Sequence, residues 1–222
     1  MGSYILLGSP GAGKGLLGQH MKEQYEMEYF SSGDILRSEV ANETEIGIEI
    51  KTTMAEGGQV NDELITQIVL KKLEALILSS KKFIIDGFPQ TLIQLESLQQ
   101  FLALYPAFPV AFVCVEVDRE TAFKRMTGRI SCLNCQKVYH RQNDPPLYDD
   151  QCDSCDGALV ARESDQNEKA AKRLDLFENS TKKIMELIKG RSDTLCIDAN
   201  GTIRDSREKF LKVHNAIQHH KK

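Results

Sequence analysis

The chain has 222 residues, and 41% of them are hydrophobic, enough for a substantial core. Its net charge is −4, with acidic and basic residues interspersed, so the composition gives no sign of a surface for nucleic acid or membrane. No stretch is long and apolar enough to span a bilayer, and residues 1–30 lack the apolar run of a signal peptide. We therefore expect a cytoplasmic protein with reduced or metal-bound cysteines.

Strand and helix patterns alternate along the chain. In chain order we expect a strand at Tyr4–Leu7, helices at Lys14–Tyr25 and Glu63–Leu78, a strand at Phe83–Ile85, a helix at Leu92–Leu104, a strand at Val110–Val117, helices at Arg119–Thr127 and Gln166–Ile188, a strand at Thr194–Ile197 and a helix at Ser206–Gln218. This order predicts an α/β fold with a parallel sheet between helices. Cys114 and Cys196 fall in expected strands, so both are expected in the core.

A glycine-rich stretch follows the first expected strand. Gly8 to Gly15 read Gly-Ser-Pro-Gly-Ala-Gly-Lys-Gly. Glycines let backbone N–H groups approach a polyphosphate, the next helix directs its positive end at the same anion, and Lys14 adds a full charge. Gly15 stands where the usual motif has a hydroxyl residue, and Leu16 follows it. The stretch still predicts a nucleotide-binding loop, because a plain flexible turn would explain neither the lysine nor the position after a strand.

Two segments interrupt the alternation of strands and helices. Residues 31–60 are polar and helical without an obvious strand, and residues 128–165 contain four cysteines, two prolines and several turn residues. Both are expected as insertions at the carboxyl ends of strands, where α/β sheets bind ligands. We thus expect a core P-loop domain of residues 1–30, 61–127 and 166–222 that carries two insertions.

The cysteines of the second insertion form two close pairs. Two residues separate Cys132 from Cys135 and Cys152 from Cys155, and sixteen residues lie between the pairs. Each pair can present two thiolates to one ion, and two pairs complete a tetrahedron around zinc. Four thiolates leave no open coordination position, so the expected zinc is structural. Unconnected cysteines or two disulfides are the alternatives.

Charged residues stand near the same positions. Asp86 ends an apolar strand, where a P-loop enzyme holds magnesium directly or through water, although a capping aspartate is the alternative. Arginines gather around the two insertions: Arg37, Arg125, Arg129, Arg162 and Arg173. Such cations neutralise the charge of a phosphoryl group in transfer, whereas any single arginine is more simply a solvated surface residue.

Together these motifs resemble the adenylate kinase family over nearly the whole chain. The glycine loop is similar to that family's G-x-P-G-x-G-K-G, Ser31–Arg37 to the start of its nucleoside-monophosphate-binding domain, and Asp86–Pro89 to its D-G-F-P-R motif. Further matches are Gln94, where the family reads adenine, Arg125 and Gly128-Arg129 before the lid, Val138–His140 within it, and Arg162, Asp165 and Arg173 after it. The four cysteines resemble the zinc-bearing form of that lid.

The resemblance implies the reaction ATP + AMP ⇌ 2 ADP in a cytoplasmic monomer, which maintains adenine nucleotide balance with Mg²⁺ and a structural Zn²⁺, and without nucleic acid or membrane partners. The implied catalytic residues are Lys14, Arg129, Arg162 and Arg173. ATP would bind at Gly11, Ala12, Gly13, Lys14, Gly15, Leu16, Arg125, Arg129, Val138, Tyr139 and Gly201. AMP would bind at Ser32, Arg37, Gly58, Gln59, Val60, Gly87, Phe88, Pro89, Gln90, Gln94, Arg162 and Arg173. Asp86 would hold magnesium through water, Cys132, Cys135, Cys152 and Cys155 would hold zinc, and the lid would exclude water.

The sequence departs from the family pattern at four positions. Leu16 and Ser32 replace threonines, and Ser164 replaces the first of two aspartates after the lid. Gln90 replaces the arginine of D-G-F-P-R, which in the family grips the AMP phosphate. An amide lacks the charge and the bidentate fork of a guanidinium, so AMP affinity is expected to fall on the order of ten- to a hundredfold.

Other functions stay open on the sequence alone. Gln90 and Ser32 border the acceptor pocket and allow a kinase for another nucleoside monophosphate, although Gln94 favours adenine. Leu16, Gln90 and Ser164 also allow a nucleotide-binding protein with little catalysis. A zinc-finger nucleic-acid binder is disfavoured, because the acidic residues around the cysteines repel phosphate: Asp144, Asp149, Asp150, Asp153 and Asp156.

Overall fold

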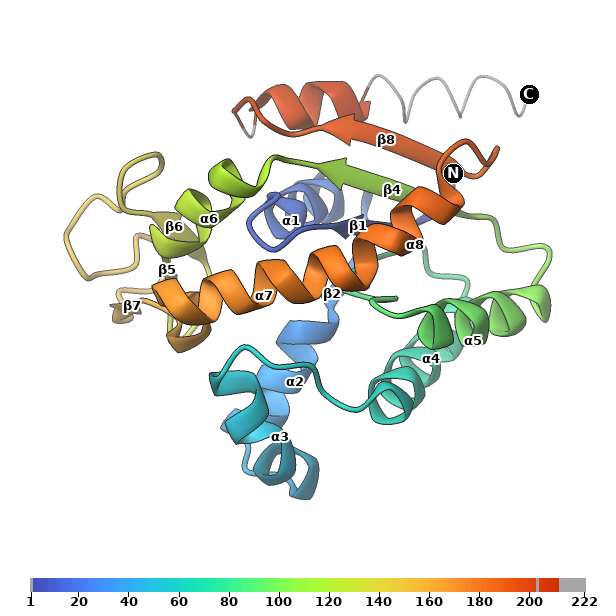
Figure 1. The fold of residues 1–222 in the computed structure, drawn as a ribbon, viewed down its shortest axis with the longest axis horizontal. Helices are drawn as coiled ribbons and strands as arrows, with labels where there is room; N and C mark the ends of the chain where they lie inside the picture. The colour runs from blue at the N-terminus through green and yellow to red at the C-terminus, as the bar shows by residue number, and fades with distance from the viewer. Residues whose placement is uncertain (1, 203, 212–222) are drawn as a thin grey trace.

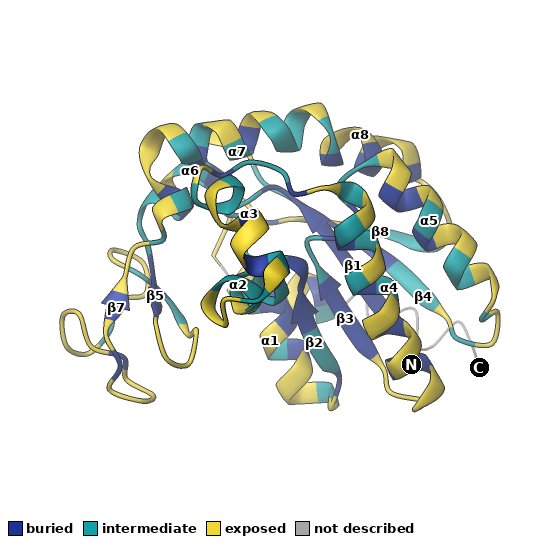
Figure 2. Ribbon diagram, turned by 90° about the horizontal axis from the view of Figure 1, so that it is seen from below, coloured by how far each residue is buried: buried dark blue, intermediate teal, exposed yellow. Residues whose placement is uncertain are grey.

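The computed structural model describes residues 2–202 and 204–211. Within them, five parallel strands form the central sheet in the order β2-β3-β1-β4-β8. The strands are β1 (Ser3–Gly8), β2 (Glu28–Ser31), β3 (Phe83–Asp86), β4 (Val110–Glu116) and β8 (Thr194–Asp198). The central strands β1 and β3 are buried along almost their whole length (Figure 2). The predicted α/β fold with a parallel sheet is confirmed.

Helices cover both faces of this sheet. They are α1 (Lys14–Tyr25), α2 (Ser32–Ala41), α3 (Glu45–Ala55), α4 (Asp62–Leu78), α5 (Leu92–Ala103), α6 (Arg119–Thr127), α7 (Asn167–Asn179) and α8 (Thr181–Ile188), and residues 204–211 are also helical. One core cluster joins the sheet to α4, α5 and α8, and a second joins it to α1 and the 204–211 helix (Figure 1). No helix in the described part has the length and apolar character of a bilayer crossing.

Capping residues in the sequence determine where several helices begin. Ser31, Thr44, Asn61 and Thr91 each accept a backbone N–H bond from the first turn of the helix that follows. Such caps satisfy N–H groups that have no partner inside the helix. Three of these caps open α2, α3 and α4, so they shape the polar segment that connects β2 to β3.

The structure corrects three expectations about the elements. Strand β2 lies in a stretch where no strand was predicted, and it pairs with β3 through Glu28–Ser31. The helix predicted over Gln166–Ile188 is two helices, α7 and α8, separated at Ser180, whose backbone is not helical. Cys196 is exposed rather than buried, because β8 is the last strand on its side of the sheet. The predicted end of the last helix, residues 212–218, lies outside the described residues.

A second sheet lies apart from the first, within residues 128–165. In the described chain its three antiparallel strands are ordered β6-β5-β7, with bounds Arg129–Cys132 for β5, Val138–His140 for β6 and Leu159–Val160 for β7. A short 3₁₀ turn, Glu163–Asp165, connects it to α7. Figure 1 shows this sheet beside α6 and the start of α7, while α2 and α3 project from another side of the molecule.

Candidate active site

A cleft of about 1020 Å³ lies between the carboxyl end of the central sheet, the α2–α3 region and the second sheet. It brings together most of the site residues predicted from the sequence. Its lining includes Gly11, Ala12, Gly13, Lys14, Gly15, Leu16, Ser32, Arg37, Gly58, Gln59, Val60, Asp86, Gly87, Pro89, Gln90, Arg125, Arg129, Val138, Tyr139, Arg162, Arg173 and Gly201. Phe88 and Gln94 are fully buried and do not belong to this lining in the described structure.

The loop between β1 and α1 is built to surround an anion. Gly11 and Gly13 have φ values of 82° and 88°, which favour glycine. A Cβ atom at Gly11 would lie 2.4 Å from the carbonyl oxygen of Ala122, so the close approach also requires glycine. No described side chain caps the start of α1, which leaves its first N–H groups directed toward the cleft.

Lys14 is held inside this loop. Its Nζ atom donates to the carbonyl oxygens of Gly8 at 2.9 Å and Ser9 at 3.0 Å, and lies 3.7 Å from Oδ1 of Asp86. Burial lowers the pKa of Lys14 and raises the pKa of Asp86, and each effect is opposed by the charge of the partner. Because a carboxylate oxygen faces the cleft beside the loop, Asp86 is suited to hold a hydrated magnesium ion.

Three arginines also line the cleft, and two of them bind one buried carboxylate, Asp165. Arg129 donates to both oxygens of Asp165, and Arg173 donates to Oδ1 of the same residue. Arg162 donates to the hydroxyl of Ser131 at 3.2 Å instead. Burial, and then the neighbouring guanidinium of Arg129, lower the pKa of Arg162 to about 9. An anion in the cleft would relieve this crowding of positive charge.

Arg37 lies across the cleft, on α2. It pairs with Asp34, yet its Nε atom is buried without a hydrogen-bond partner among the described residues. A buried N–H group usually has a partner, so this donor fits the oxygen of a bound anion. Ser32 starts the same helix, and its hydroxyl donates to the carbonyl oxygen of Gly87 at 2.6 Å.

Gln90 and Gln94 are tied to each other and to their surroundings. The backbone N–H of Gln90 donates to Oε1 of Gln94 at 2.7 Å, and the Gln90 amide donates to the carbonyl of Gly87 at 2.8 Å. The Gln94 amide donates to Asp62 at 2.8 Å. Gln94 therefore lies behind the cleft wall with both ends of its amide hydrogen-bonded.

Another group of residues lines the outer part of the cleft. Arg125, at the end of α6, donates to the carbonyl oxygen of Gly201 at 2.7 Å. Val138 and Tyr139 belong to β6 in the second sheet. These residues approach the cleft from three separated stretches of the chain, next to the glycine loop.

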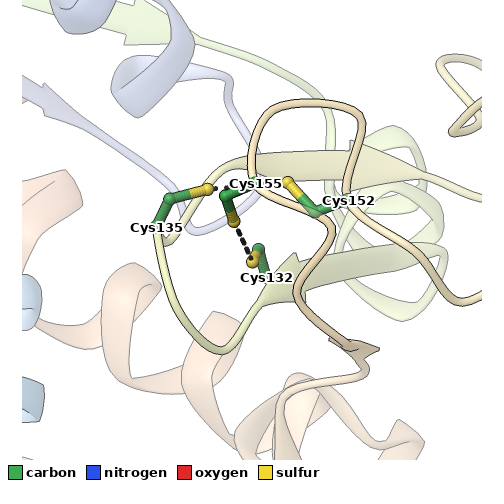
Figure 3. A group of neighbouring side chains, drawn as sticks. All are labelled: Cys132, Cys135, Cys152 and Cys155. Atoms are coloured by element: carbon green, nitrogen blue, oxygen red, sulfur yellow. Dashed lines mark hydrogen bonds between the residues drawn. The ribbon is translucent and has the colours of Figure 1, made fainter.

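The four cysteines of the second sheet converge, as Figure 3 shows. Their sulfur atoms lie within 4.8 Å of one another, and the pairs Cys132–Cys155 and Cys135–Cys152 are separated by 3.4 and 3.5 Å. A ZnS₄ tetrahedron has S–S edges of about 3.8 Å. The Tyr139 hydroxyl stabilises the thiolate of Cys152 and lowers its pKa to about 6. The geometry and the acidity of this thiol fit a metal-binding cluster.

Two cleft features went beyond the sequence interpretation. Asp165 belongs to a sequence motif, but the structure shows that it also binds Arg129, 36 positions away, and Arg173, 8 positions away. Tyr29 was not singled out, and its hydroxyl lies 3.5 Å from Oδ2 of Asp86. Tyr29 is identified by its place in β2. The sequence pattern did not predict this strand, so it gave no signal for Tyr29.

Comparison with known proteins agrees with this geometry. The sequence profile of the adenylate kinase family matches residues 6–192. An adenylate kinase of Geotalea uraniireducens (strain Rf4) is 36% identical over 211 residues, 95% of this chain and 97% of its own length. Adenylate kinases of Clostridium tetani and Thermoanaerobacter sp. (strain X514) are 36% and 35% identical, over 97% and 94% of this chain and 98% and 96% of their own lengths. The phosphate loop and the arginines agree with this similarity, which covers nearly the whole chain. The chain therefore belongs to the adenylate kinase family.

Proposed function

We propose that this chain is an active adenylate kinase, which transfers the terminal phosphoryl group of ATP to AMP and forms two ADP. The observation that carries this proposal is the convergence of the Lys14 loop, the Arg129–Arg162–Arg173 cluster and Arg37 on one cleft. The loop can hold one polyphosphate and Arg37 a second phosphate, with the other cations between them. This is the arrangement that phosphoryl transfer needs, since its catalysis is mostly positioning and charge neutralisation.

The donor nucleotide is assigned to the glycine loop. The backbone of Gly11 to Leu16 and the start of α1 would hold its phosphates. Its base would lie among the outer residues of the cleft: Arg125, Val138, Tyr139 and Gly201. Asp86 would hold Mg²⁺ through water, and the ion, when bound, neutralises charge on the phosphates.

The transfer itself is assigned to four cations. Lys14 follows the moving phosphoryl group, and Arg129, Arg162 and Arg173 neutralise its oxygens. Asp165 keeps two of these arginines in fixed orientations, so less reorganisation is needed when the phosphates bind. The unsatisfied Nε of Arg37 is the donor that would meet the acceptor phosphate.

The acceptor site is assigned to the wall that α2, the turn before α4 and the turn after β3 provide. Its members would be Ser32, Arg37, Gly58, Gln59, Val60, Gly87, Phe88, Pro89, Gln90 and Gln94, with Arg162 and Arg173 between the two nucleotides. Phe88 and Gln94 lie behind the cleft surface, so Gln94 would read adenine only after its bond to Asp62 is exchanged. Residues 31–60 would act as the AMP-binding domain and residues 128–165 as a closing lid on the core domain.

The four-cysteine cluster is assigned to structural zinc. Its four ligands would fill a tetrahedral ion, so the metal would stabilise the lid without taking part in the chemistry. We also propose a cytoplasmic monomer without nucleic acid partners. A reducing compartment keeps such thiols available for metal, a lid that must move favours a single free copy, and acidic side chains around the cysteines repel phosphate backbones.

A direct assay tests the function. Purified protein is given Mg²⁺, ATP and, in turn, AMP, CMP, UMP or GMP, and ADP formation is followed. We expect AMP to be the preferred acceptor and Arg162→Gln to abolish most turnover. Absence of ADP above background would reject the proposal, and a higher rate with another acceptor would change the assigned substrate.

A further inference from the structure

Tyr29 joins three parts of the donor site. It lies on β2, its ring packs against α1, and its hydroxyl points to Asp86 at the end of β3. The distance between its hydroxyl oxygen and Oδ2 of Asp86 is 3.5 Å. The other carboxylate oxygen, Oδ1, faces Lys14 at 3.7 Å. The two oxygens of Asp86 thus have separate partners on opposite sides.

Helix α1 has a space that matches this ring. A Cβ atom at Gly18 would lie 2.3 Å from Cε2 and 2.4 Å from Cδ2 of Tyr29, far inside contact distance. Glycine in a helix interior is less favourable than alanine, so its presence calls for a packing reason. The ring of Tyr29 supplies that reason, and any larger residue at position 18 would push the hydroxyl away from Asp86.

The hydroxyl also lies beside a gap in the glycine loop. The general P-loop pattern has Ser or Thr directly after its lysine, and that hydroxyl contacts Mg²⁺. Here the residue after Lys14 is Gly15, and Leu16 offers no hydroxyl either. The Tyr29 oxygen lies 3.4 Å from the position that a Cβ atom of Gly15 would take, and Asp86 Oδ2 lies 3.9 Å from it. The neighbouring strand therefore brings a hydroxyl close to the place where the loop lacks one.

We propose that Tyr29 is a positioning residue of the donor site, whose hydroxyl fixes Oδ2 of Asp86 so that the carboxylate stays aligned beside Lys14 for the hydrated metal. This inference rests on the proposed function and adds to it a residue outside the loop. Gly18 contributes to this positioning, because it makes room for the ring of Tyr29. The competing interpretation is a tyrosine that only fills space under β2.

The first experiment compares Tyr29→Phe with wild type in steady-state turnover and in calorimetric titration with ATP, with and without Mg²⁺. The variant removes one oxygen and keeps the ring. We expect kcat and the affinity for ATP with Mg²⁺ each to fall about three- to tenfold, the range for losing a long hydrogen bond to a charged group. Affinity for metal-free ATP should stay within about twofold, which is less than the loss of a typical hydrogen bond.

Tyr105→Phe is the matched control. Its hydroxyl donates to Glu74 at 3.1 Å on the exposed surface, far along the chain from the loop. The same atom is removed from a hydroxyl–carboxylate pair, so turnover and metal-dependent binding should equal those of wild type. If Tyr29→Phe behaves like Tyr105→Phe in all three measurements, the inference is overturned.

A double-mutant cycle separates positioning from packing. In an Asp86→Asn background, Tyr29→Phe should no longer change the ratio of ATP affinities with and without Mg²⁺, because its effect acts through the carboxylate. An equal loss in both backgrounds would mean that Tyr29 is merely structural. Gly18→Ala offers an independent variant that displaces the ring but keeps the hydroxyl, and it should reduce metal-dependent binding in the same direction. Unchanged binding in Gly18→Ala would contradict the positioning role of Tyr29.

The outcomes also distinguish this inference from the function on which it rests. Wild-type protein that forms no ADP from ATP and AMP rejects the proposed function. Wild-type protein that turns over normally, together with a fully active Tyr29→Phe, rejects only the role of Tyr29.

Discussion

Arg129 and Asp165 form a bidentate ion pair, with Nε 2.8 Å from Oδ2 and Nη2 2.9 Å from Oδ1. The side chain of Asp165 is only 2% exposed, and it also accepts a bond from Arg173. Arg129 begins β5, near the start of the segment 128–165, and Arg173 lies on α7, beyond its end. A single buried carboxylate at the end of that segment therefore joins two of the arginines that we propose to be catalytic.

Removing the Asp165 carboxylate should displace both arginines at once. In Asp165→Asn we expect kcat to fall on the order of 10- to 100-fold, because small displacements of charged groups cost that much. KM for ATP should change less, since the backbone cradle stays. Asp175→Asn is the control, as Asp175 pairs with Arg119 on the exposed surface at 2.6 Å. Equal kcat values for the two variants would contradict the linking role.

We expect Arg162 to lower the stability of the ligand-free protein and to raise its catalytic rate. The pKa of Arg162 is about 9, well below the ordinary value of an arginine, because burial disfavours the charged form. The folded state thus holds this proton less tightly than the unfolded state, and the free energy of unfolding rises as the pH increases above about 9. Below pH 9 the folded protein carries the full free-energy cost of burying the charge of Arg162. Arg162→Gln should therefore raise the melting temperature of the ligand-free protein at pH 7 and lower kcat about 10³-fold. A lower melting temperature would refute the charge argument.

Gln90→Arg should strengthen the acceptor site. A guanidinium adds the charge and the second donor that the amide lacks, so kcat/KM for AMP should rise on the order of 10- to 100-fold. KM for ATP should not move. Gln99→Arg introduces the same charge at an exposed position of α5 outside the cleft, and it should leave both constants as in wild type. No gain in Gln90→Arg would mean that Arg37 and its neighbours already saturate the acceptor phosphate.

Leu16→Thr should have little effect. The backbone N–H groups of the loop and Lys14 supply most of the phosphate contacts, so KM for ATP should change by less than about threefold, the value of one weak hydrogen bond. The measurement is an ATP titration at saturating AMP and Mg²⁺. A tenfold improvement would show that the missing hydroxyl limits the enzyme.

Metal removal should unfold the segment 128–165 before the rest of the chain. A zinc-specific chelator is expected to lower the melting temperature and to release about one ion per chain, as a closed four-thiolate site predicts. Cys135→Ser should bind less metal and melt earlier. Cys196→Ser is the control, because this exposed cysteine lies on β8, outside the cluster. An unchanged melting profile after chelation would exclude a structural ion.

The sequence predicted the local geometry of the glycine loop better than the contacts around Gln94. Strand β1, the glycine loop and α1 follow one another, so their geometry is local and Lys14 could be placed directly. Gln94 shows the limit of such reasoning. Its position in the motif is right for the family, but only the fold reveals that Asp62, 32 residues away, accepts from its amide.

Strand β2 shows a second limit. Its four residues include the charged Glu28 and the polar Ser31, and only Tyr29 and Phe30 provide an apolar signal. A strand of this length is defined by its neighbour β3 rather than by its own periodicity. Because β2 was not expected, the contact of Tyr29 with Asp86, 57 residues away, could not be expected either.

The small core of the second sheet has a consequence for how such proteins can change over generations. In the described structure this core consists of Ile130, Cys132, Tyr139, Cys152 and Leu159, so two members of the apolar core also belong to the four-cysteine cluster. Replacing Cys132 or Cys152 would remove a side chain from this core as well as a thiol from the cluster, whereas Cys135 and Cys155 are exposed. Loss of the proposed ion through a buried cysteine would therefore need compensating changes in the core, while loss through an exposed cysteine would not.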